Sequence, residues 1–176
     1  MRHPSRGTNR QPSCYQGESV TSDRRPKLIQ TIRDQIATKD NETDILRTAA
    51  ELIDNFSEDF NWTGFYMLRG STLEIGPYVG PETPHTHIEL NSGICGAAAS
   101  QKRSVIVDDV NADPRFLACS LTTRSEIVVP LLEEDECIGE IDIDSNRPAN
   151  FTDDDRKMLE EIATIIVDRL ASATRR

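Results

Sequence analysis

A chain of 176 residues with a formal net charge of −10 is long enough for one domain with an ordinary hydrophobic core. It has no apolar run of the ~18 residues that a membrane span needs, and its first residues lack the apolar stretch of a secretory signal. The 30 acidic residues outnumber the 20 basic ones, and such a surface repels phosphate backbones, so nucleic-acid binding is not expected.

The first 25 residues are polar and contain almost nothing apolar, so we predict a disordered tail over 1–25 and one domain over 26–172. Apolar residues at helical spacing then predict two helices. The first begins at Pro26, and the second begins near Asn41 or Thr43.

The pattern next changes to the two-residue period of strands. The predicted strands are, in order, 62–68, 73–78, a weaker 86–90, 104–107, 125–132 and 136–144. A short helix is predicted over 93–101, and a closing helix begins near Thr152, whose side chain can cap it. The segment 115–124 fits no pattern. Hairpin connections between the strands favour an α+β fold, with a central, mostly antiparallel sheet of about six strands and the N- and C-terminal helices packed on it.

Two aspartates close the last predicted strand, in the sequence Asp142-Ile143-Asp144. Residues two apart in a strand share a face, so the two carboxyl groups stand side by side and one of them gains proton affinity. A carboxyl group that keeps its proton at neutral pH can act as an acid or as a hydrogen-bond donor. The hairpin would also bring Glu126 close to this pair. The cluster suits a ligand with an ammonium group or an oxygen that needs a proton; alternatively, it is a solvated face of the sheet.

Trp62, the one tryptophan of the chain, alternates with Tyr66 along the first predicted strand. Such a pair is often part of the core. Beside an acidic cluster, it could instead form an aromatic wall for a small cationic or apolar-tipped ligand.

The four cysteines form no C-x-x-C pair and are too few for a disulfide framework. Cys95 begins the predicted short helix, where the helix dipole lowers the pKa of a thiol. Cys119 lies in the irregular segment just before Glu126. Two such thiols beside acids suggest thiol redox chemistry, although they could be two unrelated buried thiols. Cys137 lies on a strand and is predicted to be structural, and Cys14 falls in the tail.

These segments together resemble the free methionine-(R)-sulfoxide reductase family, a branch of the GAF-domain fold. The matching stretches are NWTGFYML (61–68), LEIGPYVG (73–80), GICGAA (93–98), VDDVN with FLACS (107–111 and 116–120), SEIVVPL (125–131), GEIDIDS (139–145) and FTDDD (151–155). The resemblance covers roughly residues 26–170, and SEIVVPL followed by G-x-x-D-I-D-S is specific to this branch. It implies a single GAF-like domain.

The resemblance also implies an activity. Members are cytoplasmic, usually homodimeric, and reduce free L-methionine-(R)-sulfoxide to methionine with no metal or organic cofactor. A cysteine thiolate attacks the sulfoxide sulfur, methionine leaves, and the sulfenic acid becomes an intramolecular disulfide that thioredoxin reduces. Carried over to this chain, Cys119 attacks and Cys95 resolves, or the two roles are exchanged.

The binding residues carry over in the same way. Glu126, Asp142 and Asp144 would hold the sulfoxide oxygen and the substrate ammonium, and one of them, protonated, would assist loss of the oxygen. Trp62 and Tyr66 would surround the S-methyl end of the substrate.

The sequence departs from the family at His85, where many members carry a third cysteine that forms the recycling disulfide. Without that cysteine, Cys95 and Cys119 must complete the cycle, or an external thiol reduces the sulfenic acid directly. His85 and His87 could in principle join the two cysteines as metal ligands, but the spacing matches no common zinc pattern and no metal is expected.

Two other functions fit the same residues. One is a non-catalytic GAF sensor that binds a small amino-acid-like ligand. The other is a thiol-redox switch in which a Cys95–Cys119 disulfide forms reversibly with peroxide and is indifferent to methionine sulfoxide.

Overall fold

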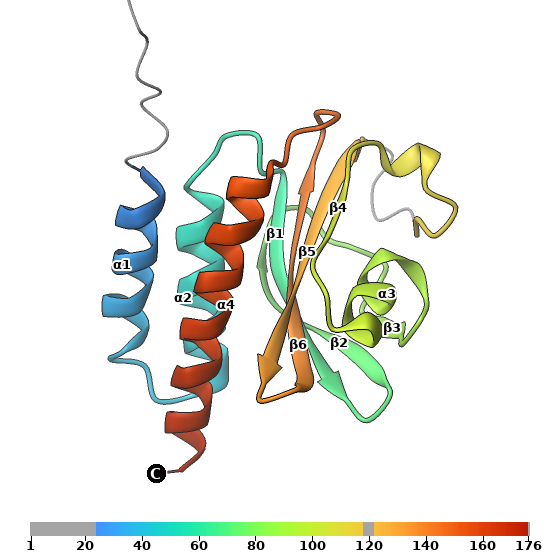
Figure 1. Ribbon diagram of the computed structural model, residues 1–176. Helices are drawn as coiled ribbons and strands as arrows, with labels where there is room; N and C mark the ends of the chain where they lie inside the picture. The colour runs from blue at the N-terminus through green and yellow to red at the C-terminus, as the bar shows by residue number, and fades with distance from the viewer. Residues whose placement is uncertain (1–23, 118–121, 176) are drawn as a thin grey trace, which may run out of the picture.

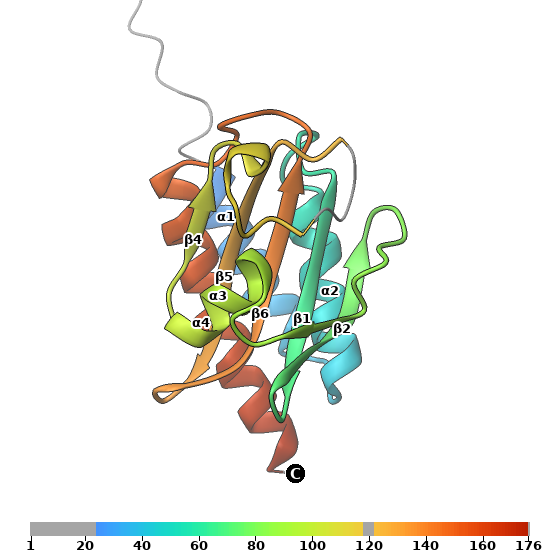
Figure 2. The same ribbon diagram turned by 90° about the vertical axis from the view of Figure 1, so that its right-hand side faces the viewer.

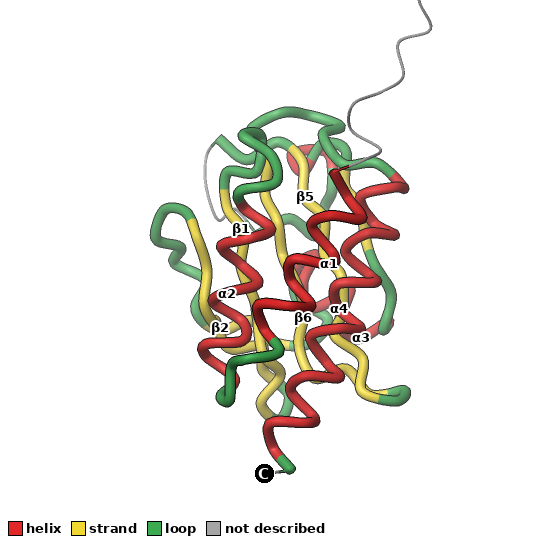
Figure 3. The backbone as a smooth tube through the Cα atoms, turned by 90° about the vertical axis from the view of Figure 1, so that its left-hand side faces the viewer, coloured by secondary structure: helices red, strands yellow, loops and turns green. Residues whose placement is uncertain are grey.

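In the computed structural model, three long helices cover one face of a six-stranded sheet and a short helix lies on the other (Figure 1). The structure describes residues 24–117 and 122–175. The long helices are α1 (Arg24–Ile36), α2 (Glu42–Asp54) and α4 (Asp153–Thr174), and Figure 3 shows them side by side. The short helix is α3 (Gly93–Gln101), which contacts β5 and β6 on the opposite face (Figure 2).

The sheet is antiparallel throughout, in the order β3-β2-β1-β6-β5-β4. Its strands are β1 (Trp62–Arg69), β2 (Thr72–Val79), β3 (His87–Glu89), β4 (Val105–Val107), β5 (Ser125–Glu133) and β6 (Glu136–Ser145), with a 3-10 turn η1 (Val110–Ala112) after β4. The predicted α+β class, the order of the elements and both long hairpins are confirmed. The predicted tail over 1–25 falls almost entirely outside the described residues, and α1 already begins two residues before Pro26.

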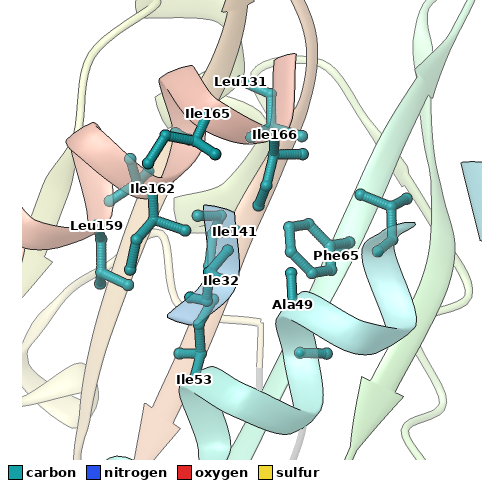
Figure 4. Close-up of a cluster of buried hydrophobic side chains, with 14 of the residues drawn as sticks. Ile32, Ala49, Ile53, Phe65, Leu131, Ile141, Leu159, Ile162, Ile165 and Ile166 are labelled. Atoms are coloured by element: carbon teal, nitrogen blue, oxygen red, sulfur yellow. The ribbon is translucent and has the colours of Figure 1, made fainter. Parts of the chain in front are cut away.

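The main core lies between the sheet and the three long helices (Figure 4). Alternate residues of the central strands point into it, among them Phe65 of β1 and Ile141 of β6. The helices supply the opposite wall, with Ile32, Ile53 and Ile162 all fully buried. Because side chains alternate along a strand, the intervening residues of β1, β5 and β6 must face α3.

The start of α4 is fixed as the sequence predicts. The Thr152 side chain accepts a hydrogen bond from the Asp155 backbone, and the Asp155 carboxylate accepts one from the Thr152 backbone. This reciprocal capping box satisfies two otherwise unpaired backbone donors. Arg25 of α1 also pairs with Asp155 at 2.7 Å, which joins the first and last helices. Among the helices of the described ranges, none is long and apolar enough to cross a membrane.

Close backbone contact at Gly96 fixes the position of α3. A Cβ atom at this residue would lie 2.4 Å from the carbonyl oxygen of Glu89 and 3.1 Å from the backbone nitrogen of Asn91. These neighbours are backbone atoms and cannot rotate away, so only glycine allows the helix to approach the end of β3 this closely. The contact therefore also positions Cys95, the preceding residue.

We expect Gly96→Ala to lower the thermal unfolding midpoint by roughly 2–10 °C, because overpacking costs about 1–3 kcal/mol in a chain of this size. Helix propensity alone predicts the opposite sign, since alanine favours a helix by about 1 kcal/mol over glycine. Circular dichroism melting curves of the two proteins would measure the change. A higher midpoint in the variant would show that α3 can shift without cost.

Candidate active site

The face of the sheet that lies under α3 carries a row of acidic and aromatic residues. On β6, Glu140, Asp142 and Asp144 point to this face, because they alternate with the core residues Ile141 and Ile143. The register of β5 places Glu126 opposite Asp144, as the predicted hairpin requires. On the other side of β6, the register of β1 places Trp62 opposite Asp144 and Tyr66 opposite Glu140.

The three predicted acids form a buried cluster. Glu126, Asp142 and Asp144 are only 5%, 3% and 5% exposed. The alternative of a solvated sheet face is therefore wrong at these positions. Burial of a carboxyl group without a matching cation is costly, so a cluster of this kind indicates a functional site more strongly than the sequence pattern alone did.

The Cys95 thiol lies among these carboxyl groups. Its Sγ atom is 3.7 Å from Oε1 of Glu126 and 3.6 Å from Oδ2 of Asp142, within reach of a hydrogen bond from the thiol to either oxygen. Cys95 is the third residue of α3 and is buried. The predicted position at a helix N-terminus is confirmed, and the structure adds two acid neighbours within hydrogen-bond distance.

Burial shifts these acids toward their protonated forms. Loss of solvent raises the pKa of Glu126 and of Asp142 well above the ordinary values, and repulsion from neighbouring carboxyl groups raises them further. Burial raises the pKa of Asp144 to about 7, although a hydrogen bond with Thr123 opposes the shift. Proton donors of this kind can protonate a developing oxyanion or hydroxide leaving group.

A fourth acid of the site, Glu140, was missed in the sequence. Its side chain is fully buried, and within the described part of the chain neither carboxyl oxygen has a hydrogen-bond partner by distance and angle. Burial raises the pKa of Glu140 well above its usual value, Asp142 raises it further, and the nearby Cys95 thiol lowers it. The sequence does contain a pattern that points to it. The two-residue period of a strand places Glu140 on the same face as Asp142 and Asp144.

The raised pKa values predict a protein that is less stable at high pH. A folded-state pKa above the unfolded value means that stability falls as pH rises from about 4 through the folded pKa. For Asp144, a shift from 3.8 to about 7 removes roughly 2 kcal/mol between pH 5.5 and 8, or about 4–8 °C of melting temperature. Glu126, Glu140 and Asp142 act in the same direction.

Melting curves at pH 5.5 and pH 8 would measure this difference, and the midpoint should be higher at pH 5.5. In Glu140→Gln the difference should shrink, because one of the titrating groups is removed. A midpoint that is equal or higher at pH 8 would show that the buried acids are ionised in the folded protein.

The predicted aromatic pair is present and has a third member. The ring of Trp62 stacks on Tyr66 with 6.0 Å between centroids, and on Tyr78 of β2 with 5.3 Å. Gly64 makes this possible, since a Cβ there would lie 2.5 Å from Cη2 of Trp62 and 2.6 Å from Cβ of Tyr78. The Tyr66 hydroxyl donates a 2.8 Å hydrogen bond to the backbone carbonyl of His85.

A pocket of about 170 Å³ opens between Trp62 and Asp144. Its lining residues are Asn61, Trp62, Pro81, Glu82, Thr83, Thr122, Thr123, Asp144 and Asn146. The Trp62 Nε1 atom is buried and has no hydrogen-bond partner among the described residues. A small molecule in this pocket would therefore meet an aromatic ring and a buried acid together. No sequence pattern identifies Asn61 or the three threonines as lining residues, because they come together only when the loops fold.

Cys119 lies outside the described residues, and its role as the attacking thiol stays a prediction. The described residues on either side of it approach the site. Leu117 lies against Gly93 at the start of α3, where its Cδ1 atom would be 2.8 Å from a Cβ on that glycine. On the other side, Thr123 bonds to Asp144.

The remaining candidates lie elsewhere. His87 is exposed on β3. Within the described residues, the group of side chains whose ligand atoms converge is Cys95 with Glu126 and Asp142, and it does not include either histidine considered for the four-ligand set. Cys137 is buried in β6 and donates a 3.2 Å hydrogen bond to the carbonyl of Gly139, in keeping with its predicted structural role.

Comparison with known proteins places this site in a family. Residues 39–171 match the family described as GAF domain. The free methionine-R-sulfoxide reductase of Escherichia coli (strain K12) is 34% identical over 143 residues, which cover 80% of this chain and 86% of that protein. The enzyme of the same name from Saccharomyces cerevisiae is 42% identical over 112 residues, which cover 61% of this chain and 62% of that protein.

A solved structure supports the same family. The free methionine-R-sulfoxide reductase from Neisseria meningitidis, solved in complex with its substrate, superimposes with a TM-score of 0.85 at 31% identity and covers 90% of this chain and 95% of that one. The fold, the acid and thiol cluster and these relatives agree: the chain belongs to the free methionine-R-sulfoxide reductase family of the GAF-domain fold.

Proposed function

We propose that this protein reduces free L-methionine-(R)-sulfoxide to methionine, with its own cysteine thiols as the immediate electron donors. The observation that carries the proposal is a buried thiol, Cys95, held among buried carboxyl groups beside an aromatic pocket. The names of the relatives in Escherichia coli and Saccharomyces cerevisiae support the choice of substrate.

The attack requires a thiolate and an acid. A cysteine thiolate attacks the sulfoxide sulfur. The oxygen then moves from the substrate sulfur to the cysteine sulfur: the S–O bond of the sulfoxide breaks, the S–O bond of a sulfenic acid forms, and methionine leaves as the reduced sulfide. The sulfoxide oxygen must gain a proton during this step. Burial raises the pKa of Glu126 and of Asp142 well above the usual values, and both flank Cys95, so either, in its protonated form, can supply it.

The second thiol closes the cycle. It attacks the sulfenic acid, a disulfide forms and water leaves. In our assignment Cys119 attacks the sulfoxide and Cys95 resolves, and the exchange of the two roles remains the alternative. No metal or organic cofactor takes part. Two electrons from thioredoxin then restore both thiols.

The pocket explains a preference for the free amino acid. Asp144 lines it and can pair with the substrate ammonium, while the rings of Trp62 and Tyr66 accept the S-methyl end. An ammonium group next to Asp144 would favour the ionised carboxylate, which burial alone disfavours. We further propose a cytoplasmic homodimer, as the family resemblance implies.

A coupled assay tests the electron source. With thioredoxin, thioredoxin reductase and NADPH, we expect NADPH oxidation that depends on both the protein and free methionine-(R)-sulfoxide. Chelator treatment should leave the rate undiminished. Turnover with dithiothreitol but not with thioredoxin would retain the reductase and reject the proposed donor.

A further inference from the structure

We propose that the thiol and carboxyl cluster of Cys95, Glu126 and Asp142 binds one zinc ion, and that this occupation inhibits the protein reversibly. The binding step is independent of the reaction, whereas the inhibition rests on the proposed function.

The distances fit a tetrahedral ion. With sulfur at ~2.3 Å and oxygen at ~2.0 Å from zinc, the edge between a sulfur and an oxygen ligand is about 3.5 Å. The observed separations from Cys95 Sγ are 3.7 Å to Glu126 and 3.6 Å to Asp142. One ligand atom from each of these three residues lies within 4.8 Å of the others. The two sulfur–oxygen separations would therefore need to shorten by only about 0.1–0.2 Å to hold an ion.

The cluster also has buried oxygens to spare. Oδ1 of Asp142 and both carboxyl oxygens of Glu140 are buried with no hydrogen-bond partner by distance and angle among the described residues. Their side chains belong to residues that are 3% and 0% exposed. Glu140 lies two residues before Asp142 on the same face of β6, outside the group of side chains whose ligand atoms converge. Water would supply the fourth ligand, and the ion would satisfy the Asp142 oxygen that otherwise lacks a partner.

The charge around the cluster favours a cation. Four buried acids, counting Asp144, lie on the adjoining strands β5 and β6, and as carboxylates they would repel one another. Among the described residues, Arg115 interacts with Glu126, but its guanidinium already pairs with Asp113 at 2.6 Å. A divalent ion relieves this repulsion when Cys95 and the coordinating carboxyl groups release their protons to solvent. The thiolate ligand selects zinc over magnesium or calcium.

Inhibition follows from the identity of the sulfur ligand. A zinc-bound Cys95 can neither attack the sulfoxide nor resolve a sulfenic acid on another cysteine. Glu126 and Asp142, once bound to the ion as carboxylates, have no proton to give to the sulfoxide oxygen, so the first methionine does not form even when Cys119 attacks. The inhibition therefore holds for either assignment of the two thiols. Removal of the ion by a chelator restores the reduced site without any change in covalent structure.

Two measurements on the reduced full-length protein test the proposal. Titration calorimetry with zinc chloride should give one site per chain, and cobalt(II) should give the absorption band of a thiolate ligand. Methionine formed in a single turnover, with no added thiol to compete for the ion, should fall to the background with one equivalent of zinc. A chelator should restore it, and magnesium should have no effect.

Variants identify the ligands. Cys95→Ser, Glu126→Gln and Asp142→Asn should each weaken zinc binding at least tenfold, and the cobalt thiolate band should vanish in Cys95→Ser. Cys137→Ser removes a buried thiol outside the cluster and should change neither. Melting curves without metal would identify any variant that fails to fold, and the remaining carboxyl variant then decides.

Two results would overturn the site: no zinc binding in the calorimeter, or binding that is lost in Cys119→Ser and retained in Glu126→Gln and Asp142→Asn, which indicates a two-thiol site. A protein that forms no methionine but binds zinc through these residues keeps the metal site and loses only the inhibition. If the protein forms the same amount of methionine with zinc bound as without it, the metal site stands and the proposed inhibition is rejected.

Discussion

Cys119→Ser should abolish methionine formation, by a factor of a thousand or more, because it removes the sulfur that attacks the sulfoxide. Serine keeps the size of the side chain but is a far weaker nucleophile than a thiolate at neutral pH. Losses of this size are typical when a covalent nucleophile is replaced. Rapid quenching of the reduced variant with substrate, followed by quantification of methionine, measures the loss directly.

Cys95→Ser provides the matched comparison. If Cys95 resolves, this variant should form one methionine per chain, stop, and accumulate a sulfenic acid that a dimedone-type reagent captures. If the roles are exchanged, Cys95→Ser is the dead variant and Cys119→Ser stops after one turnover. Full turnover by both variants would rule out the two-thiol mechanism.

Asp144→Asn should lower kcat/KM for the free amino acid by about 10–100-fold, since a hydrogen bond to a charged group contributes roughly 1.5–3 kcal/mol. Asp144 is buried at the pocket wall, so solvent does not screen its interaction with an ammonium group. Asparagine keeps the shape but carries no charge. Steady-state kinetics with the free and with the N-acetylated sulfoxide measure kcat/KM for each substrate.

The N-acetylated substrate distinguishes loss of ammonium recognition from a general loss of activity. The unmodified protein should discriminate strongly against it, and Asp144→Asn should lose most of that discrimination, because neither partner then carries the charge. Asp154→Asn, which changes an exposed aspartate at the start of α4, is the control and should behave as the unmodified protein. Equal loss on both substrates in Asp144→Asn would assign the residue a structural role.

The periodicity of the sequence predicted most of the fold. Alternation along β5 and β6 placed Ile141 and Ile143 in the core and the two aspartates on the opposite face, and the acidic turn fixed the register that brings Glu126 to Asp144. These features depend on neighbouring residues and on one hairpin. Local pattern is sufficient for them.

Burial was beyond the reach of the same pattern. A strand has the same alternating pattern whether its polar face is exposed to solvent or covered by another element. Here α3 covers that face, and its approach depends on a backbone contact at Gly96. For this reason a solvated face was a reasonable alternative for the acids. The role of Glu140 was missed on the same ground, since a glutamate in a strand is usually exposed.

The pocket also depends on contacts distant in sequence. Tyr78 stacks on Trp62 because β1 and β2 pair across a residue without a side chain, Gly64. Thr123 reaches Asp144 from the loop before β5. Neither relation has a spacing rule that would reveal it in one sequence.

The most direct test of the central claim uses the reduced protein, dithiothreitol and an equal mixture of the two epimers of free methionine sulfoxide. We predict that half of the sulfoxide is converted to methionine and that the remainder, resolved by chiral chromatography, is the S epimer alone. No methionine from folded protein, or equal consumption of both epimers, would contradict the account and favour a ligand-binding or redox-sensing role for this site.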